Sequence, residues 1–245
     1  MRIRVLTLFP DFVRAYFQAS IMAKAVERGL ISYDVVDIRD FAADKHRTCD
    51  DYPYGGGPGM VLKPEPLGAA LDSVNATEKR TVYPTPSGRL LKQATLAELS
   101  SEEEVVLICG RYEGIDQRII DYYVDDELSI GDYVISSGEL AAMVIIDGLF
   151  RLRRGVITSE SLAEESFEDG LLEYPHYTRP EVYKGMRVPD VLLSGHHERI
   201  RQWRLKKREE KTRAHRQDLL EWAERPGAAD EKVERRQEDG SSESR

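Results

Sequence analysis

The sequence predicts an α/β fold, in which a domain built on a parallel β-sheet is followed by a small helical region toward the C-terminus. Over roughly the first 150 residues, short runs rich in β-branched side chains alternate with helical patterns, as in parallel sheets whose strands are joined by helices. The chain has 245 residues, of which 41% are hydrophobic. This content is enough to bury the core of one large domain or of two modest ones.

Strands are expected where apolar and β-branched residues run together between turn residues. The predicted strands are residues 4–9, 33–38, 81–83, 105–109 and 133–136. Helices are expected where apolar residues recur at helical spacing. The predicted helices are residues 11–28, 65–74, 90–99, 115–123 and 140–153. Ser136 and Glu139 precede the last of them at the spacing of a capping box.

The pattern changes after Gly155, where Ser, Glu, Gly, Pro and aromatic residues predict a linker. Helical apolar spacing returns between Asp190 and Trp222, and after Arg225 the chain has almost no apolar residues to bury. We therefore predict a first domain, a flexible linker, a helical domain and a disordered tail. Their predicted bounds are 1–160, 161–175, 176–225 and 226–245.

Several classes of protein are disfavoured by the composition. No apolar run approaches the roughly 18 residues of a membrane span, and the first residues do not resemble a signal peptide. The two cysteines, Cys49 and Cys109, have no spacing typical of zinc ligands or of a disulfide framework. The histidines likewise show no metal-ligand spacing. We expect a cytoplasmic protein with no membrane partner and no metal site.

The net charge of −9 argues against a nucleic-acid partner only if the charge is averaged over the chain. Residues 98–132 carry eleven acids and two arginines, whereas residues 198–216 carry nine bases and three acids. A basic patch near the C-terminus is therefore predicted, and such a patch is typical of phosphate binding.

Three glycine-containing segments are candidate ligand loops. The run Tyr54-Gly55-Gly56-Gly57-Pro58-Gly59-Met60 lacks the ending of a phosphate-binding loop, and by itself it indicates a tight turn. Residues 109–116 follow a predicted strand and precede a helix, and residues 129–138 form a second such loop that also runs into a helix start. In open α/β folds, ligands bind at the carboxyl ends of strands, so these two loops indicate a pocket. Ordinary strand-to-helix turns are the alternative interpretation.

Carboxylates gather in the predicted linker at Glu164, Glu165, Glu168 and Asp169. Such a cluster is most often a solvated acidic face, and a general base is the rarer interpretation. The arginines at 151, 153 and 154 are equally typical of the C-terminus of a helix, where cations are favoured by the helix dipole.

Taken together, the motifs resemble those of the bacterial tRNA (guanine-N1)-methyltransferases, a family of the SPOUT superfamily that methylates guanosine at tRNA position 37. The resemblance covers roughly the first 220 residues. It rests on the glycine-rich run at 54–60 with His46-Arg47-Thr48 before it, Cys109-Gly-Arg-Tyr-Glu-Gly-Ile-Asp116, Ser129-Ile-Gly-Asp-Tyr-Val134 and Pro175-His-Tyr-Thr-Arg-Pro-Glu-Val182.

The resemblance implies a parallel sheet with a deep trefoil knot at the C-terminal end of the first domain, and a homodimer with active sites at the subunit interface. It implies S-adenosyl-L-methionine as methyl donor, held in the knot by three loops. The cofactor-binding residues it implies are Tyr83, Pro84, Thr85, Pro86, Gly88, Gly110, Arg111, Tyr112, Glu113, Gly114, Ile130, Gly131, Asp132, Tyr133, Val134, Ile135, Ser137 and Gly138. Whether Mg²⁺ assists is left open.

The resemblance also implies Glu165 as general base and Arg151 as the arginine beside the target base. The tRNA anticodon stem-loop is the implied partner. The implied tRNA-binding residues are His46, Arg47, Asp50, Tyr54, Gly55, Gly59, Ser166, His176, Tyr177, Arg179, Arg201, Arg204 and Lys206.

Four positions depart from the family pattern. Glu165 replaces the usual aspartate, Ser137 a glycine and Ala141 a proline, and Arg154 stands where Pro-Gly is common. The extra methylene of Glu165 moves its carboxylate by about 1 to 1.5 Å. We still expect activity, because a glutamate side chain is able to fold back.

Three other functions are weighed against this one. A ribose 2′-O-methyltransferase of the same superfamily would lack the linker carboxylate and the signature at 175–180. A non-catalytic RNA-binding protein would explain the basic patch but not three ligand loops. A Rossmann-type methyltransferase would need a glycine fingerprint after the first strand, where this chain has Phe9-Pro10-Asp11.

Overall fold

The computed structural model describes residues 1–157, 165–167 and 169–223. The chain forms two compact units, Met1–Thr158 and Ser159–Arg245, which we describe separately. The predicted tail at 226–245 and part of the predicted linker lie outside the described residues, so both stay predictions. No helix in the described ranges is long and apolar enough to cross a membrane.

Unit one is built on a five-stranded sheet with the order β2-β1-β6-β5-β7. Every neighbouring pair is parallel, which confirms the predicted α/β fold with a parallel sheet. The strands are β1 (Arg2–Thr7), β2 (Ser32–Asp37), β5 (Arg80–Leu90), β6 (Glu104–Ile108) and β7 (Asp126–Ser129).

The predicted strand at 133–136 is wrong, and the fifth strand is β7. Its sequence, Asp-Glu-Leu-Ser, lacks the β-branched residues by which the other strands were predicted. Asp126 is nevertheless buried, because Arg80 Nε and Arg89 Nη2 donate hydrogen bonds to its two carboxylate oxygens at 2.7 and 2.6 Å. Long-range ion pairs that no local pattern reveals therefore stabilise this strand.

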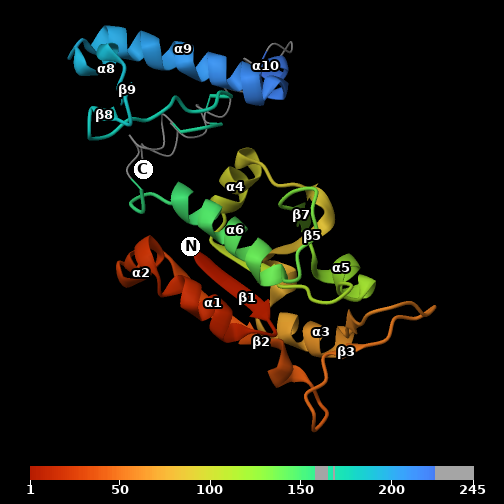
Figure 1. The fold of residues 1–245 in the computed structure, drawn as a ribbon. Coiled ribbons are helices and arrows are strands. Elements are labelled where there is room, and N and C mark those ends of the chain that lie inside the picture. Colours follow the sequence, from red (N-terminus) through yellow and green to blue (C-terminus); the bar gives the residue numbers. More distant parts are fainter. Residues whose placement is uncertain (158–164, 168, 224–245) are drawn as a thin grey trace. The chain divides into compact units, whose positions relative to one another are not determined.

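Helices cover both faces of the sheet (Figure 1). They are α1 (Pro10–Phe17), α2 (Ser20–Glu27), α3 (Pro64–Ser73), α4 (Gln93–Ser100), α5 (Gln117–Tyr123) and α6 (Gly138–Leu152). Short 3₁₀ turns follow β2 and α3, at η1 (Ile38–Phe41) and η2 (Ala76–Glu78). Helices α1, α2, α4 and α6 share one core with one face of the sheet, while α3, α5 and η1 pack on the other.

Side chains alternate between the two cores along each central strand. In β6, Val105 and Leu107 face the α6 side, whereas Val106 and Ile108 face the α3 side. Because both faces are covered, the strand is a continuous apolar run. This explains why β6 was readily predicted from the sequence.

The single helix predicted at 11–28 is two helices. Phe17 of α1 and Met22 of α2 both belong to the core, but they are five positions apart, which would place them on different sides of one straight helix. The extended backbone at Ala19 separates the two helices and changes the direction in which their side chains point. Both helices are therefore able to bury an apolar face.

The segment between η1 and α3, orange in Figure 1, projects from unit one as two loops. A short antiparallel pair, β3 (Asp50–Asp51) with β4 (Val61–Leu62), joins their bases. The glycine-rich run at 54–60 forms the loop between these strands.

Unit two holds a hairpin, β8 (Val182–Tyr183) with β9 (Met186–Arg187), and the helices α8 (Asp190–Leu193), α9 (His197–His215) and α10 (Gln217–Ala223). Helix α9 packs on the segment that precedes the hairpin. Arg204 stacks on the buried ring of Tyr174 at 4.5 Å, and Thr212 Oγ1 accepts a hydrogen bond from Leu172 N at 2.9 Å. The middle of this basic helix therefore has a packed side as well as an exposed one.

The ion pairs of Asp126 should make part of the stability pH-dependent. Burial, the largest influence, raises the pKa of this carboxyl, but the hydrogen bonds from Arg89 and Arg80 outweigh it, and the pKa is lowered. The stabilisation is then fully present above the usual aspartate pKa of about 3.9 and is lost as pH falls through the lowered value.

We expect D126N to destabilise the protein by roughly 2 kcal/mol at pH 7, less than for a fully buried pair because both arginines are partly exposed. Urea unfolding at pH 7 and at pH 3 measures this. The difference between D126N and the unsubstituted protein should shrink at the lower pH, and an equal difference at both would contradict the assignment.

Candidate functional site

The ends of β5, β6 and β7 bring three loops to one edge of the sheet. Because the strands are parallel, their carboxyl ends lie at the same edge. Residues 110–114 follow β6, residues 130–138 follow β7, and residues 83–88 form an irregular stretch within β5. These are the segments predicted to bind the cofactor. The structure therefore brings all three predicted segments together, while their ligand stays a prediction.

The closest meeting point of these loops is at two glycines. Gly138 N donates a hydrogen bond of 3.1 Å to Gly110 O, which joins the first residue of α6 to the end of β6. A Cβ atom at Gly138 would lie 2.6 Å from Gly110 N, and the backbone there has no room to yield. The contact between positions 138 and 110 therefore requires glycine at position 138.

The predicted capping box at the start of α6 is wrong. The residue before the helix is Ser137, and its side chain makes no capping hydrogen bond to the backbone. Its Oγ donates instead to Glu139 Oε2, and the other oxygen of Glu139 accepts from Thr7 Oγ1 of β1 at 2.6 Å. Glu139 is thus directed into the protein rather than back to its own helix end.

The aromatic ring of Tyr83 packs against the loop at 110–114. A Cβ atom at Gly110 would lie 2.8 Å from the Tyr83 ring, so the aromatic ring packs directly on the glycine backbone. The ring is buried, and burial raises the pKa of its hydroxyl. Burial thus favours the protonated hydroxyl over the phenolate.

The loop at 83–88 leaves the ladder between β5 and β7. Pro84 and Arg89 both face Leu128, so the residues between them bulge away from the strand. A Cβ atom at Gly88 would lie 2.4 Å from the carbonyl carbon of Glu127, which shows how closely the bulge crosses β7. Thr85 and Ser87 face each other across it, with 3.1 Å between their hydroxyl oxygens.

The glycine-rich loop at 54–60 contacts the 110–114 loop. Glu113 N donates to Met60 O at 3.0 Å, and Glu113 packs so closely on Gly59 that a Cβ atom there would meet its carboxylate at 2.4 Å. Gly55, Gly56, Gly57 and Gly59 all have positive φ, which confirms the predicted tight turn. Tyr54, at the tip, is fully exposed.

Comparison with known proteins identifies the family. The family model described as tRNA (Guanine-1)-methyltransferase TrmD matches residues 1–222. This chain belongs to that family. A tRNA (guanine-N(1)-)-methyltransferase of Treponema denticola is 65% identical over 93% of each chain. The Treponema pallidum protein of the same name is 59% identical over 96% of this chain and 94% of its own, and that of Borrelia turicatae is 58% identical over 94% and 98%.

The loop cluster fits an elongated donor such as S-adenosylmethionine. At Gly88, Gly110 and Gly138 the space that a Cβ atom would need is taken by neighbouring backbone or by the Tyr83 ring, so backbone segments meet there directly. Tyr112, Tyr133 and Val134 are at least half exposed on the same loops, which leaves apolar surface for a ligand to cover. Within the described ranges, no three His, Cys, Asp or Glu side chains are grouped to hold a metal ion.

The two predicted catalytic residues lie in different units. Arg151 is exposed in the last turn of α6, and Glu165 is partly buried at the start of the described part of unit two. Glu164 and Glu168 lie outside the described residues. Within the same cluster, Asp169 accepts a hydrogen bond from Arg208 Nη1 at 2.8 Å. Roles for Glu165 and Arg151 in this family member stay predictions.

The predicted tRNA-binding residues of unit one lie in two loops. Tyr54, Gly55 and Gly59 belong to the glycine-rich loop, and the others lie at or near the turn at 44–48. Asp44 accepts hydrogen bonds from His46 N and Thr48 N at 2.9 and 2.8 Å, and these bonds lower the pKa of its carboxyl. The turn leaves His46 and Arg47 exposed, while Asp50 begins β3.

The predicted tRNA-binding residues of unit two are of two kinds. Arg201, Lys206 and Tyr177 are exposed, whereas Arg204 is partly buried on Tyr174 and Ser166 Oγ accepts from Glu173 N at 2.9 Å. His176 pairs with Glu173 at 2.7 Å, and Arg179 is exposed. Arg204 and Ser166 thus also stabilise the fold of unit two.

One contact near the site was not predicted from the sequence. The guanidinium of Arg111 lies 4.8 Å above the ring of Phe9, which follows β1. The position of Phe9 at the end of the first predicted strand is the available signal, because the carboxyl ends of parallel strands line the ligand edge.

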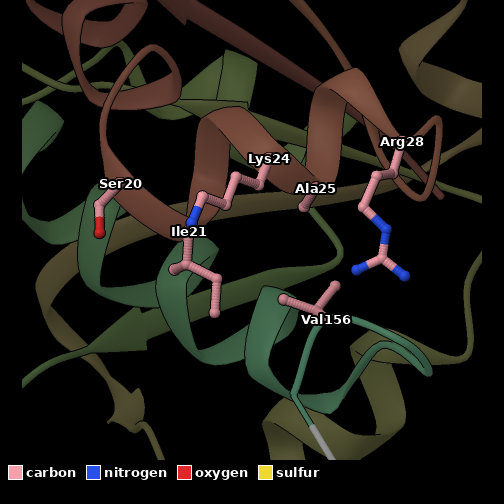
Figure 2. A pocket seen from close by; sticks show the side chains of 6 residues that line it. All are labelled: Ser20, Ile21, Lys24, Ala25, Arg28 and Val156. Atoms are coloured by element: carbon pink, nitrogen blue, oxygen red, sulfur yellow. The ribbon is translucent and has the colours of Figure 1, made fainter.

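A shallow cavity of about 270 Å³ lies elsewhere, at the amino-terminal edge of the sheet. Figure 2 shows Ser20, Lys24 and Arg28 of the α2 region along it, with Val156 opposite. Arg28 Nη1 also donates to Gly155 O at 3.0 Å. Because α6 runs from Gly138 to Leu152 between the two edges, this cavity is separate from the loop cluster.

We expect G138A to destabilise the protein by about 2 kcal/mol and to weaken donor binding, because the new Cβ atom would force the two loops apart. The matched control is G68A in α3, where a Cβ atom would meet nothing closer than 3.5 Å. G68A should be neutral or stabilising by up to about 1 kcal/mol. Thermal unfolding compares the two, and similar behaviour would refute the close-contact argument.

Proposed function

We propose that this chain transfers the methyl group of S-adenosyl-L-methionine to ring nitrogen 1 of guanosine 37 in tRNA, next to the anticodon. Methyl transfer to guanine in tRNA is the activity of the family to which the chain belongs. The donor, the tRNA position and the residue roles are our additions. The observation that carries them is the cluster of three loops joined at Gly110 and Gly138. A tRNA substrate places the reaction in the cytoplasm.

The donor would lie against the loops at 83–88, 110–114 and 130–138. When bound, S-adenosylmethionine supplies an electrophilic methyl group. Backbone groups of these loops would hold its polar ends, and Tyr112 and Tyr133 would cover its apolar parts. We further propose that the chain crosses through itself here as a trefoil knot, which the close crossing of Gly88 over β7 supports.

Guanine ring nitrogen 1 carries a proton that must leave during the transfer. We assign this proton to the carboxylate of Glu165. A carboxylate with an ordinary pKa of about 4.3 is a weak base for this task, so negative charge must also be stabilised on guanine oxygen 6. We assign that role to Arg151, with a contribution of about 2 to 4 kcal/mol by analogy with oxyanion donors.

The target base must leave the stack of the anticodon loop to be reached. We propose that exposed cations of α9, such as Arg201 and Lys206, hold the tRNA through its phosphates. In unit one, His46 and Arg47 would contact the same stem-loop from their turn. These groups position the RNA, whereas the glycine-rich loop at 54–60 would lie near the base.

We also propose that the active unit is a homodimer. Leu140 and Val144 are about half exposed and lie four positions apart on α6, so they share one face with Arg151. Phe12 of the neighbouring α1 is also half exposed, and Tyr16 of α1 donates to Asp147 of α6 at 2.8 Å. An exposed apolar stripe across two adjacent helices is typical of a protein interface. Its place beside Arg151 supports an active site completed by the second subunit.

Replacing Val144 by Lys should give monomers and abolish methyl transfer, because a charge would be buried in the interface. The control is Y122K on α5, on the other side of the sheet, where the tyrosine is also largely exposed. Light scattering gives the mass of each variant. A fully active V144K monomer would refute the homodimer.

Replacing Glu165 by Gln keeps the side chain's size but removes its basicity. We expect turnover to fall by about 10² to 10⁴ while donor binding barely changes. E165D should retain substantial activity. If E164Q is instead the damaging change, the base is the neighbouring residue, and if neither matters, the carboxylate cluster is a solvated face.

Replacing Arg201 and Lys206 by Ala should weaken tRNA binding across sequences and lower the salt slope by about 0.7 to 0.9 log units for each lost phosphate contact. K207A on the same helix is the control, because the Lys207 side chain is only 38% exposed and pairs with Glu210 at 2.6 Å. Arg201 also pairs, with Glu198 at 2.9 Å, but its side chain is 80% exposed. Filter binding at several salt concentrations measures the slope. Equal slopes for all variants would contradict the role of α9.

Identification of the methylated atom tests the proposed function directly. The protein is incubated with S-adenosylmethionine and unmodified tRNA transcripts that carry G or A at position 37, and the digested nucleosides are identified by mass and retention. N1-methylguanosine from the G37 transcript alone is the expected product. A ribose-methylated nucleoside would favour the 2′-O-methyltransferase alternative, and absence of product would favour a binding protein.

A further inference from the structure

Glu139 is an acidic side chain that the proposed mechanism leaves without a role. It is 2% exposed, in the first turn of α6, and its two carboxylate oxygens accept from different parts of the fold. Thr7 Oγ1, at the end of β1, donates to Oε1 at 2.6 Å, and Ser137 Oγ, in the 130–138 loop, donates to Oε2 at 2.5 Å. A buried carboxylate with both oxygens satisfied fixes the groups that donate to it.

The first arm of this network leads to the 110–114 loop. Thr7 Oγ1 also accepts from Phe9 N at 2.9 Å, which fixes the backbone that carries the Phe9 ring. That ring supports the guanidinium of Arg111 at 4.8 Å. Two hydrogen bonds and one cation–π contact thus connect Glu139 through the end of β1 to a side chain of the loop.

The second arm leads to the point where the loops meet. Ser137 directly precedes Gly138, whose N–H bonds to Gly110 O at 3.1 Å with no space for a side chain. The backbones of Gly138 and Gly110 meet with almost no spare space. The position of the preceding residue, Ser137, therefore decides whether the hydrogen bond between them forms. A negative charge near the start of α6 is also favoured by the helix dipole.

We propose that Glu139 is a positioning residue of the methyl-donor site, which sets the 110–114 and 130–138 loops against each other through Thr7 and Ser137. The inference rests on the proposed function only in naming S-adenosylmethionine as the ligand of these loops. Glu139 touches no reacting atom. Its effect should therefore fall on donor binding rather than on turnover at saturation or on tRNA affinity.

The test compares two buried threonines of the same sheet. Thr7 lies at the carboxyl end of β1, whereas Thr81 lies near the amino end of β5, and both are fully buried. Thr81 Oγ1 donates to Ala76 O at 3.2 Å and to Lys79 O at 3.4 Å, so T7V and T81V each remove one buried hydroxyl and two hydrogen bonds. T7S, which keeps the hydroxyl, serves as rescue, and E139Q keeps the size of the acid.

Calorimetric titration with S-adenosylmethionine, without tRNA, gives the Kd of each variant. Thermal unfolding gives stability, and steady-state assays give KM for both substrates. We expect T7V and E139Q to raise Kd and KM for the donor about tenfold, with kcat at saturation and KM for tRNA within about twofold. T7S should restore donor binding. T81V should lower Tm as much as T7V and leave donor Kd unchanged.

Two results would overturn the inference. If T7V and T81V lower Tm equally and neither changes donor Kd, the network is structural only. If E139Q lowers kcat and leaves donor Kd unchanged, Glu139 acts on the reaction itself and is not a positioning residue. Failure of the unsubstituted protein to bind S-adenosylmethionine would instead refute the proposed function, so the two failures are distinguishable.

Discussion

The contact between Gly138 and Gly110 is the constraint on which the rest of unit one's functional edge depends. Its hydrogen bond of 3.1 Å holds the start of α6 against the end of β6, although α6 follows β7 and β5 separates the two strands in the sheet. The chain must therefore cross the sheet edge to reach it. That crossing brings the 130–138 loop to the loops that end β5 and β6.

Other features follow from this crossing. Tyr83 packs on Gly110, Glu113 packs on Gly59, and Gly88 lies on the backbone of Glu127. At each contact a side chain or a strand occupies the space that a Cβ atom would need. Glycine is thus used here for close approach between segments, and the resulting edge presents backbone groups and exposed aromatic rings to a ligand.

Much of the fold could be predicted from sequence because its signal is local. The apolar residues of β1 and β6 reflect burial on both faces of the sheet. β7 could not be predicted, since Asp126 is buried only through arginines of β5. The break between α1 and α2 could not be predicted, because both parts are amphipathic. The spacing of Phe17 and Met22, which does not fit one helix, indicates a break only when both are known to face the core.

The same division applies to the site. The glycine-containing segments predict the ligand loops, and the motifs indicate the family. The local reading of Ser136 and Glu139 as a capping box failed, because a buried hydroxyl of β1 competes for the carboxylate. The hydrogen-bond partner of such a side chain depends on segments that are distant in the sequence. The spacing of residues within one segment does not reveal that partner.

Backbone amide exchange with and without S-adenosylmethionine tests the central claim, that the loops joined at Gly110 and Gly138 form the donor site. We predict slower exchange at residues 110–114 and 130–138 when the donor is present, with no change along the α2 cavity lined by Lys24 and Arg28. Unchanged exchange in both loops, or protection confined to the α2 cavity, would contradict the account.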